Sequence, residues 1–465
     1  MSDEAVTGGF TLTGPMSASA DMLPLFSDQA AVQRMLDFEA ALARAEAANG
    51  VIPAAAVAPI AACCQAARLD LPALAQAAAA AGNLAIPLVR QLTAAVLRED
   101  AEAGKYVHWG ATSQDAIDTG LVLQLRDALD LLDADLAALA DALASLARAH
   151  RDTTMVGRTW MQHALPTSLG LKAAGCLDAV LRHQQRLQEV RKRALVLQFG
   201  GAAGTLASLG DKGLPVAATL AHALGLALPD LPWHTQRDRV AEVATVLGLL
   251  TGTLGKMARD ISLLMQTDVG EVAEPAAAGR GGSSTMPHKR NPVGCAIALT
   301  AAMRVPALVS TMLSGMVQEH ERALGGWQAE WDTLPDIVLL CSGALRQMRD
   351  VAAGLQVDAA RMRANLELTQ GLIMGEAVML ALGPAIGRMA AHKLVEQASA
   401  QAAASGRHLR DVLGSDVEVG RHLSSDALDR LFDPAAYLGG AGAFVDRVLA
   451  SHERGKHQFQ QERNA

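Results

Sequence analysis

The chain has 465 residues and a formal net charge of −8, and 51% of its residues are hydrophobic while only 3% are aromatic. The acidic balance argues against nucleic acid as a partner, and the chain contains no run of about 18 uninterrupted apolar residues, the length that spans a membrane. A core built from Ala, Leu, Val, Ile and Met favours closely packed helices over sheets.

The N-terminal part is predicted to be helical. Asp3 and Glu4 stand where a secretory signal would carry positive charge, so we expect a cytoplasmic protein. Residues 28–49 repeat apolar side chains at spacings of three and four, and Asn49-Gly50, followed by Pro53, ends that pattern. Shorter Ala-rich helices are expected up to Gly104.

Five long helices are predicted further along the chain. They cover residues 119–150, 166–197 and 237–266, a stretch after Pro292 and a stretch after Pro335. Their apolar stripes are wide, as in helices buried on several sides. The predicted fold class is therefore all-α, with a bundle of long helices whose core continues across subunits. The polar residues 451–465 and the first residues up to about Gly14 are expected to be loose tails.

The five cysteines are predicted to be reduced and mostly buried. Their number is odd, no C-x-x-C pair is present, and no Cys/His spacing suits zinc. Cys295 follows the most distinctive loop of the chain, and we expect its thiol to be accessible.

The first of three polar segments is residues 105–119. Thr112, Ser113 and Gln114 precede a long helix, where free backbone N–H groups and hydroxyls bind carboxylates. The same residues could instead cap the helix together with Asp115 and Asp118. His108 could be a packed or a catalytic histidine.

The second segment is residues 157–166, and the third is residues 278–292. Gln162 and His163 could donate to a carboxylate or move a proton, or this loop could simply satisfy its own backbone. The third segment carries glycines, then Ser283 and Ser284, with Lys289 close behind. A serine acts as a base when cations and N–H groups stabilise its alkoxide. The alternative is a flexible basic linker.

The Gly-Ser-Ser-x-Met-Pro-x-Lys-x-Asn-Pro pattern at 282–292 resembles the signature loop of the fumarase/aspartase superfamily, and the other two segments match that family in order and spacing. The resemblance implies three domains, placed here at 1–110, 111–356 and 357–465, with the long-helix bundle in the middle. It implies a homotetramer whose active sites combine segments of three subunits. It implies no metal or organic cofactor.

The resemblance also assigns roles to single residues. Ser283 matches the serine that the family uses as carbon-acid base, and Ser284 beside it is a candidate substrate contact. Lys289 and Asn291 match residues that hold a substrate carboxylate. Further matches to substrate contacts are Thr112, Ser113 and Gln162, and His108 matches a histidine of the adenylosuccinate-lyase branch.

The sequence departs from the fumarate-releasing members at two positions. Trp160 stands where they have a histidine, and Ala296 stands where they have its glutamate partner. Nitrogen and hydroxide leaving groups need an acid, whereas a carboxylate with a solution pKa of about 4 departs unaided. The loss of both partners together therefore favours lactone chemistry.

Three further runs resemble the muconate-type cycloisomerase branch: residues 157–166, 286–293 and 318–327, with 232–239 fitting as well. That branch closes 3-carboxy-cis,cis-muconate, a small tricarboxylate, to 4-carboxymuconolactone in the protocatechuate branch of the β-ketoadipate pathway. The resemblance implies Ser283 as proton donor. His163 is the rival, expected to face the same way as Trp160 on a helical turn.

Other roles stay open at this point. Arg322 and Arg237 could bind substrate carboxylates or form surface ion pairs. Trp160 could pack on the substrate or belong to the core. A fumarate-releasing lyase of the argininosuccinate or adenylosuccinate type is the nearest alternative function. An inactive structural homologue and a dicarboxylate-binding regulatory protein are alternatives of other classes.

Overall fold

The computed structural model describes residues 12–276, 281–282, 285–286 and 288–464. The chain divides into two compact units. Unit 1 comprises residues 1–136, 183–255 and 297–347, and unit 2 comprises residues 137–182, 256–296 and 348–465. The predicted all-α class is confirmed: in the described residues helices dominate, and the strands form two small two-stranded sheets.

The helices and strands have the following bounds: α1 Gly14–Ser17, α2 Asp28–Ala48, α3 Val57–Cys63, α4 Leu71–Ala81, α5 Ala85–Glu99, α6 Ser113–Ala149, β1 Thr154–Thr159, β2 Gln162–Ser168, α7 Leu169–Ala194, α8 Gly213–Leu224, α9 Asp238–Leu264, β3 Val272–Ala273, α10 Val293–Ser314, α11 Gly326–Gly354, β4 Gln356–Val357, α12 Ala359–Leu366, α13 Gly375–Ile386, α14 Arg388–Ser405, α15 Leu409–Gly414, α16 Val417–His422, α17 Ser425–Leu431 and α18 Ala441–Asn464.

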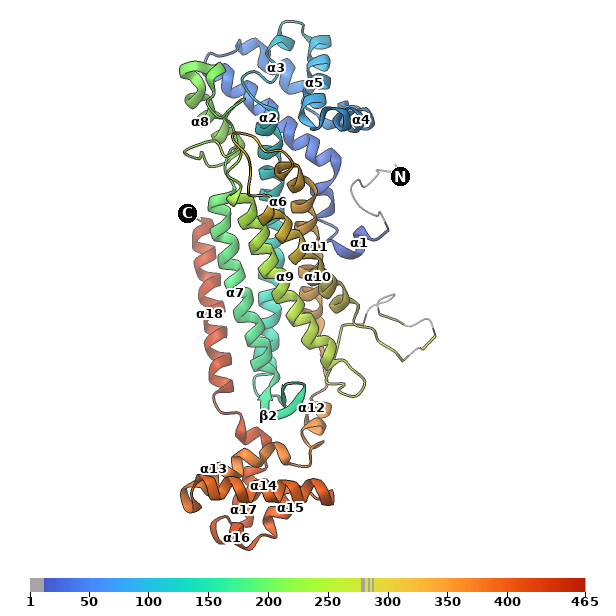
Figure 1. Cartoon of the computed structure of the whole chain (residues 1–465), viewed down its shortest axis with the longest axis vertical. Helices are drawn as coiled ribbons and strands as arrows, with labels where there is room; N and C mark the ends of the chain where they lie inside the picture. The colour runs from blue at the N-terminus through green and yellow to red at the C-terminus, as the bar shows by residue number, and fades with distance from the viewer. Residues whose placement is uncertain (1–11, 277–280, 283–284, 287, 465) are drawn as a thin grey trace. The chain divides into compact units, whose positions relative to one another are not determined.

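In unit 1, the helices α2, α3, α4, α5 and α8 gather into one cluster, coloured blue to green in Figure 1. Helix α2 starts where the Ser27 hydroxyl accepts a hydrogen bond from the Ala30 N–H at 3.2 Å. Its inner face buries Leu36, Phe38 and Leu42 in a shared core. The predicted span 28–49 is confirmed to within one residue, because the cap and the Asn49-Gly50 stop are both local signals.

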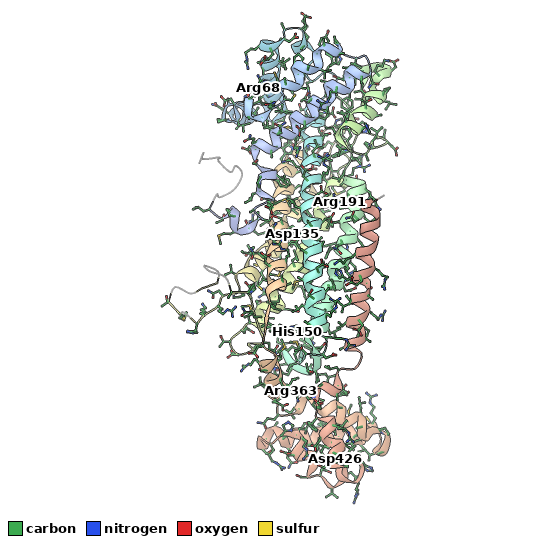
Figure 2. All side chains as sticks on the ribbon, turned by 180° about the vertical axis from the view of Figure 1, so that it is seen from behind. Arg68, Asp135, His150, Arg191, Arg363 and Asp426 are labelled. Carbon is green, nitrogen blue, oxygen red and sulfur yellow. The ribbon has the colours of Figure 1, made fainter. Side chains whose placement is uncertain are left out.

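The unit 1 parts of α6, α7, α9, α10 and α11 run beside one another (Figure 1). Figure 2 labels Arg191 on α7 and Asp135 on α6. The Arg191 guanidinium pairs with Asp133 of α6 at 2.9 Å, and Arg346 of α11 donates to Asp135 at 3.2 Å. These part-buried ion pairs fix which helix faces lie together.

Helix α2 crosses α6 closely at Gly120. A Cβ atom at this position would lie 3.1 Å from the Met35 Cγ and 3.2 Å from the Met35 backbone nitrogen. Such contacts are tighter than ordinary van der Waals distances, so the absence of a side chain at Gly120 permits the crossing.

Helices α9 and α10 are long and apolar enough to cross a membrane by length and composition alone, a test that core helices of soluble proteins also pass. The most apolar window of α9 is 61% buried, but that of α10 is only 28% buried. Met303 and Leu313 of α10 are correspondingly exposed. Helix α10 therefore presents an apolar face that unit 1 of a single chain leaves uncovered.

In unit 2, β1 and β2 form an antiparallel hairpin with an irregularity between Val156 and Arg158. Helices α13 to α17 form a small core of their own. Helix α18 is tied to the unit 2 part of α6, where His150 lies near the end (Figure 2), by a 2.8 Å contact between His452 Nε2 and Asp141 and by the pairing of Arg151 with Asp446.

Four sequence predictions are wrong. Residues 154–168 form a hairpin, so the predicted helix 166–197 starts only at Leu169. Helix α11 begins at Gly326 and carries Pro335 in its interior. Residues 451–464 continue α18 rather than form a loose tail. The side chain of Cys295 is fully buried, not accessible.

The prediction of reduced, mostly buried cysteines is confirmed, because all five are free thiols and four are buried. The domain boundaries at 110 and 356 stay predictions. Residues 1–11 lie outside the described residues.

Candidate active site

The N-terminus of α6 is held by its own first turn. The Thr112 N–H donates to the Asp115 carboxylate at 3.0 Å, which is the reciprocal half of a capping box. The Thr112 hydroxyl does not cap the helix; it accepts a hydrogen bond from Arg322 at 3.0 Å. The capping alternative therefore holds for Asp115, while the hydroxyl of Thr112 is used elsewhere.

Asp115 organises the surroundings of this helix end. Its fully buried carboxylate accepts hydrogen bonds from five groups at 2.9 to 3.1 Å, which are the N–H groups of Thr112, Gly200 and Gly201, the Gln198 amide and His234 Nε2. Buried charge is tolerated only with such compensation. The consequence is a rigid junction between α6, the loop at 198–201 and the run at 232–239.

Arg237 lies in a second buried cluster. Its guanidinium donates to Asp118 at 2.6 and 3.1 Å and to Glu330 at 3.0, 3.2 and 2.5 Å, and it stacks over Trp233 at 4.8 Å. Burial opposes its charge, but the two carboxylates raise the pKa of Arg237 above its ordinary value. Arg237 thus forms neither the surface ion pair nor the substrate contact considered from the sequence; its hydrogen bonds are structural.

Arg322, near the N-terminus of α6, has capacity left for a ligand. It is half-buried and donates to the Thr112 hydroxyl and, at 3.1 Å, to the Ala202 carbonyl. Neither acceptor carries a full charge, so no carboxylate neutralises this guanidinium among the described residues. The structure thereby brings the predicted residues Thr112 and Arg322 into direct contact, although 210 positions separate them.

His108 lies just before this helix end, in a left-handed backbone conformation with φ of 59°. Its Nδ1 atom is 2.6 Å from the Oε1 atom of Glu39, which is buried in α2. Burial disfavours the charged imidazole, but the charge and hydrogen bond of Glu39, together with the charge of Asp115, raise the pKa of His108 above its ordinary value. Glu39 carries no motif and was not predicted.

Trp160 and Met161 form the tip of the β1–β2 hairpin in unit 2, both with positive φ. Trp160 is 97% exposed, so the alternative of core packing within the chain is wrong. Because this segment is a hairpin, His163 does not follow Trp160 on a helical turn; His163 pairs across the strands with Arg158. Gln162 is exposed.

His163 has a buried Nδ1 atom that finds no hydrogen-bond partner within the described part of the chain. Burial and the nearby charge of Arg158 lower its pKa below the ordinary value, although Glu271 opposes the shift. Arg158 is itself paired with the buried Glu271 at 2.7 and 2.9 Å, and Asn365 donates to the same carboxylate at 2.8 Å. The hairpin thus carries a neutral imidazole, and the hydrogen bonds of Glu271 with Arg158 and Asn365 hold the hairpin in place.

Two of the predicted residues of the signature loop can be described. Lys289 is exposed. The Asn291 N–H donates to the Gly281 carbonyl at 2.8 Å, which closes the base of the loop. Behind it, the Glu274 carboxylate accepts hydrogen bonds from the N–H groups of Gly294 and Cys295 at 3.0 and 2.8 Å, at the start of α10. Ser283 and Ser284 lie outside the described residues.

The predicted residues therefore fall into two groups, each within one unit. Unit 1 holds the helix-mouth group, defined as His108, Thr112, Ser113 and Arg322. Unit 2 holds the hairpin-loop group, defined as Trp160, Gln162, His163, Lys289 and Asn291. Among described residues, no group of three or more His, Cys, Asp or Glu side chains could hold a metal ion.

The fold and these motifs define a class of protein. The model of a lyase family matches residues 14–307, and that of the adenylosuccinate lyase C-terminus matches residues 371–448. The chain belongs to this lyase family, within the fumarase/aspartase superfamily.

Particular relatives are more informative. The chain is 62% identical to the 3-carboxy-cis,cis-muconate cycloisomerase of Pseudomonas aeruginosa, over 93% of this chain and 95% of that protein. It is 58% identical to the cycloisomerase of the same name from Bradyrhizobium diazoefficiens, over 95% and 98%. The crystal structure of the 3-carboxy-cis,cis-muconate lactonizing enzyme from Pseudomonas putida matches with a TM-score of 0.92 and 58% identity, over 96% of this chain and 99% of that one.

Proposed function

We propose that this protein is an enzyme that converts 3-carboxy-cis,cis-muconate to 4-carboxymuconolactone. The observation that carries the proposal is the 62% identity over 93% of the chain to a cycloisomerase of this substrate. The same identity disfavours the fumarate-releasing alternative, as do Trp160 and Ala296 in place of the histidine and glutamate that assist basic leaving groups.

The reaction is an internal addition. A substrate carboxylate oxygen forms a bond to a carbon of the conjugated diene, and the electron pair of that double bond moves toward the remote carboxylate as an aci-carboxylate. A proton then adds to the carbon beside that carboxylate. No atom is lost and no oxidant is needed, so the enzyme has to bind negative charge and deliver one proton.

Charge stabilisation falls to cations and helix N-termini. In this proposal Lys289 and Asn291 hold the carboxylate on which charge develops. Thr112, Ser113 and the N-terminus of α6 bind a second carboxylate, and Arg322, which no carboxylate neutralises among described residues, adds positive charge beside them. Trp160 packs on the planar diene, with Gln162 and Ser284 as further contacts.

The proton donor is Ser283 or His163. The resemblance favours Ser283. After a serine donates its proton it becomes an alkoxide, which a cation such as Lys289, six positions along the sequence, can stabilise. His163 is supported by its unpartnered Nδ1, but its lowered pKa makes the imidazole neutral near pH 7, so it would donate from the neutral ring or act through water.

The proposal includes a homotetramer in the cytoplasm, with each active site assembled from several subunits. Two observations support the assembly. The helix-mouth and hairpin-loop groups belong to different units of the chain, and α10 exposes an apolar face that a subunit contact would bury.

The test is a substrate comparison with purified enzyme. Ring closure removes the conjugated diene, so the ultraviolet absorbance of 3-carboxymuconate should fall, and argininosuccinate and adenylosuccinate should release no fumarate. Release of fumarate with an unchanged diene spectrum would replace this proposal by the lyase alternative. Turnover of neither kind would favour a non-catalytic role.

A further inference from the structure

Glu39 is a buried carboxylate with one partner. It lies in α2 with about 2% of its surface exposed, its Oε1 atom contacts His108 Nδ1 at 2.6 Å, and its Oε2 atom has no hydrogen-bond partner among the residues that the structure describes. A buried charge is costly unless it is paired. For Glu39 the compensating partner is a histidine of the helix-mouth group.

The backbone on both sides holds this contact. Met35 of α2 lies one helical turn before Glu39 and packs at Gly120 of α6, where a side chain would collide. His108 adopts φ of 59° and Gly110 adopts φ of 71°. A left-handed conformation at a non-glycine residue is an energetic cost that surrounding contacts must offset. The crossing of α2 over α6 and the strained loop together bring the imidazole to Glu39.

The contact determines which ring atom remains for a ligand. Because a carboxylate only accepts hydrogen bonds, Nδ1 of His108 carries the proton toward Glu39. Nε2 is then the remaining polar atom of the ring, and it has no hydrogen-bond partner among the described residues. The paired carboxylate also favours the doubly protonated ring, in which Nε2 is a charged donor.

We infer that Glu39 is a positioning residue, which fixes the orientation and positive charge of His108 so that Nε2–H binds a carboxylate of the substrate. The inference rests on the proposed function for the identity of that substrate. It adds a cation to the helix-mouth group, which already contains Arg322 in contact with Thr112 at the N-terminus of α6. A tricarboxylate substrate needs several such positive partners.

The other charges near His108 do not replace Glu39. Asp115 at the start of α6 favours the charged imidazole, but its carboxylate is already surrounded by five donors, which include His234. Asp118 and Glu330 are bound to Arg237. Glu39 is therefore the carboxylate whose removal should change the titration of His108.

The first experiment compares Glu39→Gln with wild type across pH 6 to 8.5. Wild-type KM should rise as pH increases through the raised pKa of His108, because the cation is lost. In Glu39→Gln only the charge of Asp115 still opposes the effect of burial on the pKa of His108, so the same rise should occur about one pH unit lower, with KM about tenfold higher at pH 7.5. The value of kcat should change by less than about threefold.

Glu46→Gln is the matched control. Glu46 lies two turns along the same helix and is equally buried, but burial, together with the charge of Glu39, raises its pKa to about 9. It is therefore neutral over most of the range tested, and the amide changes no charge. Its KM profile should match wild type. A Glu46→Gln profile that shifts like that of Glu39→Gln would overturn the inference, because the effect would then be general core damage.

The second experiment is independent of activity. Titration of isotope-labelled histidines by NMR, with His108→Gln to assign the signal, should show the His108 midpoint falling in Glu39→Gln and unchanged in Glu46→Gln. An unchanged midpoint in Glu39→Gln would overturn the inference even if KM rose. In the His108→Gln background, Glu39→Gln should add no further KM effect; an additive effect would also overturn it. Wild-type enzyme that fails to turn over 3-carboxymuconate would refute the proposed function. The titration would still show whether Glu39 controls the ionisation of His108.

Discussion

The helix-mouth group and the hairpin-loop group differ in how deeply their surroundings are buried and in how many of their polar groups are hydrogen-bonded. Around the helix mouth, Asp115, Asp118 and Arg237 have several hydrogen-bond partners each and are almost completely buried. In the hairpin-loop group, Trp160 and Lys289 are exposed, and a buried nitrogen of His163 has no hydrogen-bond partner among the described residues. The surroundings of the helix-mouth group are therefore organised before any ligand binds. The hairpin-loop group offers surface and unused hydrogen-bonding capacity, which a substrate or another subunit can use.

If this contrast is correct, changes in the hairpin-loop region should reduce turnover without unfolding the protein. Ser283→Ala should lower kcat on the order of 10⁴-fold, the upper range for loss of a proton-transfer group, while the circular dichroism spectrum and oligomer size stay unchanged. Steady-state kinetics on 3-carboxymuconate measures this. A near-normal Ser283→Ala enzyme, with His163→Gln inactive, would transfer the proton donor to His163.

Changes around the helix mouth should instead cost stability. Arg237→Met leaves Asp118 and Glu330 buried without their cation, and the expected loss is about 3–5 kcal/mol of unfolding free energy. Arg239→Met is the control, since this partly exposed arginine donates, within the described residues, only to the Arg193 carbonyl, and it should cost less than about 1 kcal/mol. Denaturant unfolding compares the two. Equal losses of unfolding free energy in the two variants would show that the buried cluster of Arg237 contributes no special stability.

Glu46 should make the stability of the buried region depend on pH. The folded chain keeps this carboxyl protonated to about pH 9, whereas the unfolded chain ionises it near its ordinary value of 4.5. The folded state therefore binds more protons, and the unfolding free energy must fall as pH rises between these values. From pH 5 to pH 8 wild type should lose about 2–4 kcal/mol more than Glu46→Gln. Parallel stability profiles for the two proteins would contradict this.

The smallest expected effect on stability concerns Trp160. Its side chain is almost fully exposed in the single chain, so Trp160→Ala should change the free energy of unfolding of the subunit by less than about 0.5 kcal/mol. Its kcat/KM should nevertheless fall, because the indole contacts the substrate in the proposed function. A stability loss with unchanged kcat/KM would contradict this view, because Trp160 would then support the fold rather than contact the substrate.

Local signals explain what the sequence revealed. The span of α2 follows from Ser27 at one end and Asn49-Gly50 at the other, and the contact of Thr112 with Arg322 joins two segments that the motifs had already selected. The hairpin was missed because Trp160 and Met161 adopt left-handed conformations without the Asn or Gly that usually marks such a turn. Pro335 was misread as a helix start, although a long packed helix tolerates it.

The remaining site residues were hidden for a different reason. Glu39 is 69 positions from His108, and His234 is 119 positions from Asp115. Glu39 does not differ locally from the many acidic residues on helix surfaces, and for Asp115 the sequence offered a capping role but not its distant hydrogen-bond partners. Only the crossing of helices identifies them, because pairing depends on which faces meet in space.

The close crossing at Gly120 has a consequence for anyone who redesigns this fold. The hydrogen atom of Gly120, in place of a methyl group, lets α2 lie close to α6, and α2 carries the Glu39 carboxylate that contacts His108. A Gly120→Ala variant chosen to improve helix propensity would thereby retune an ionisation equilibrium. The distance between the backbones of α2 and α6 would thus affect the charge state of His108.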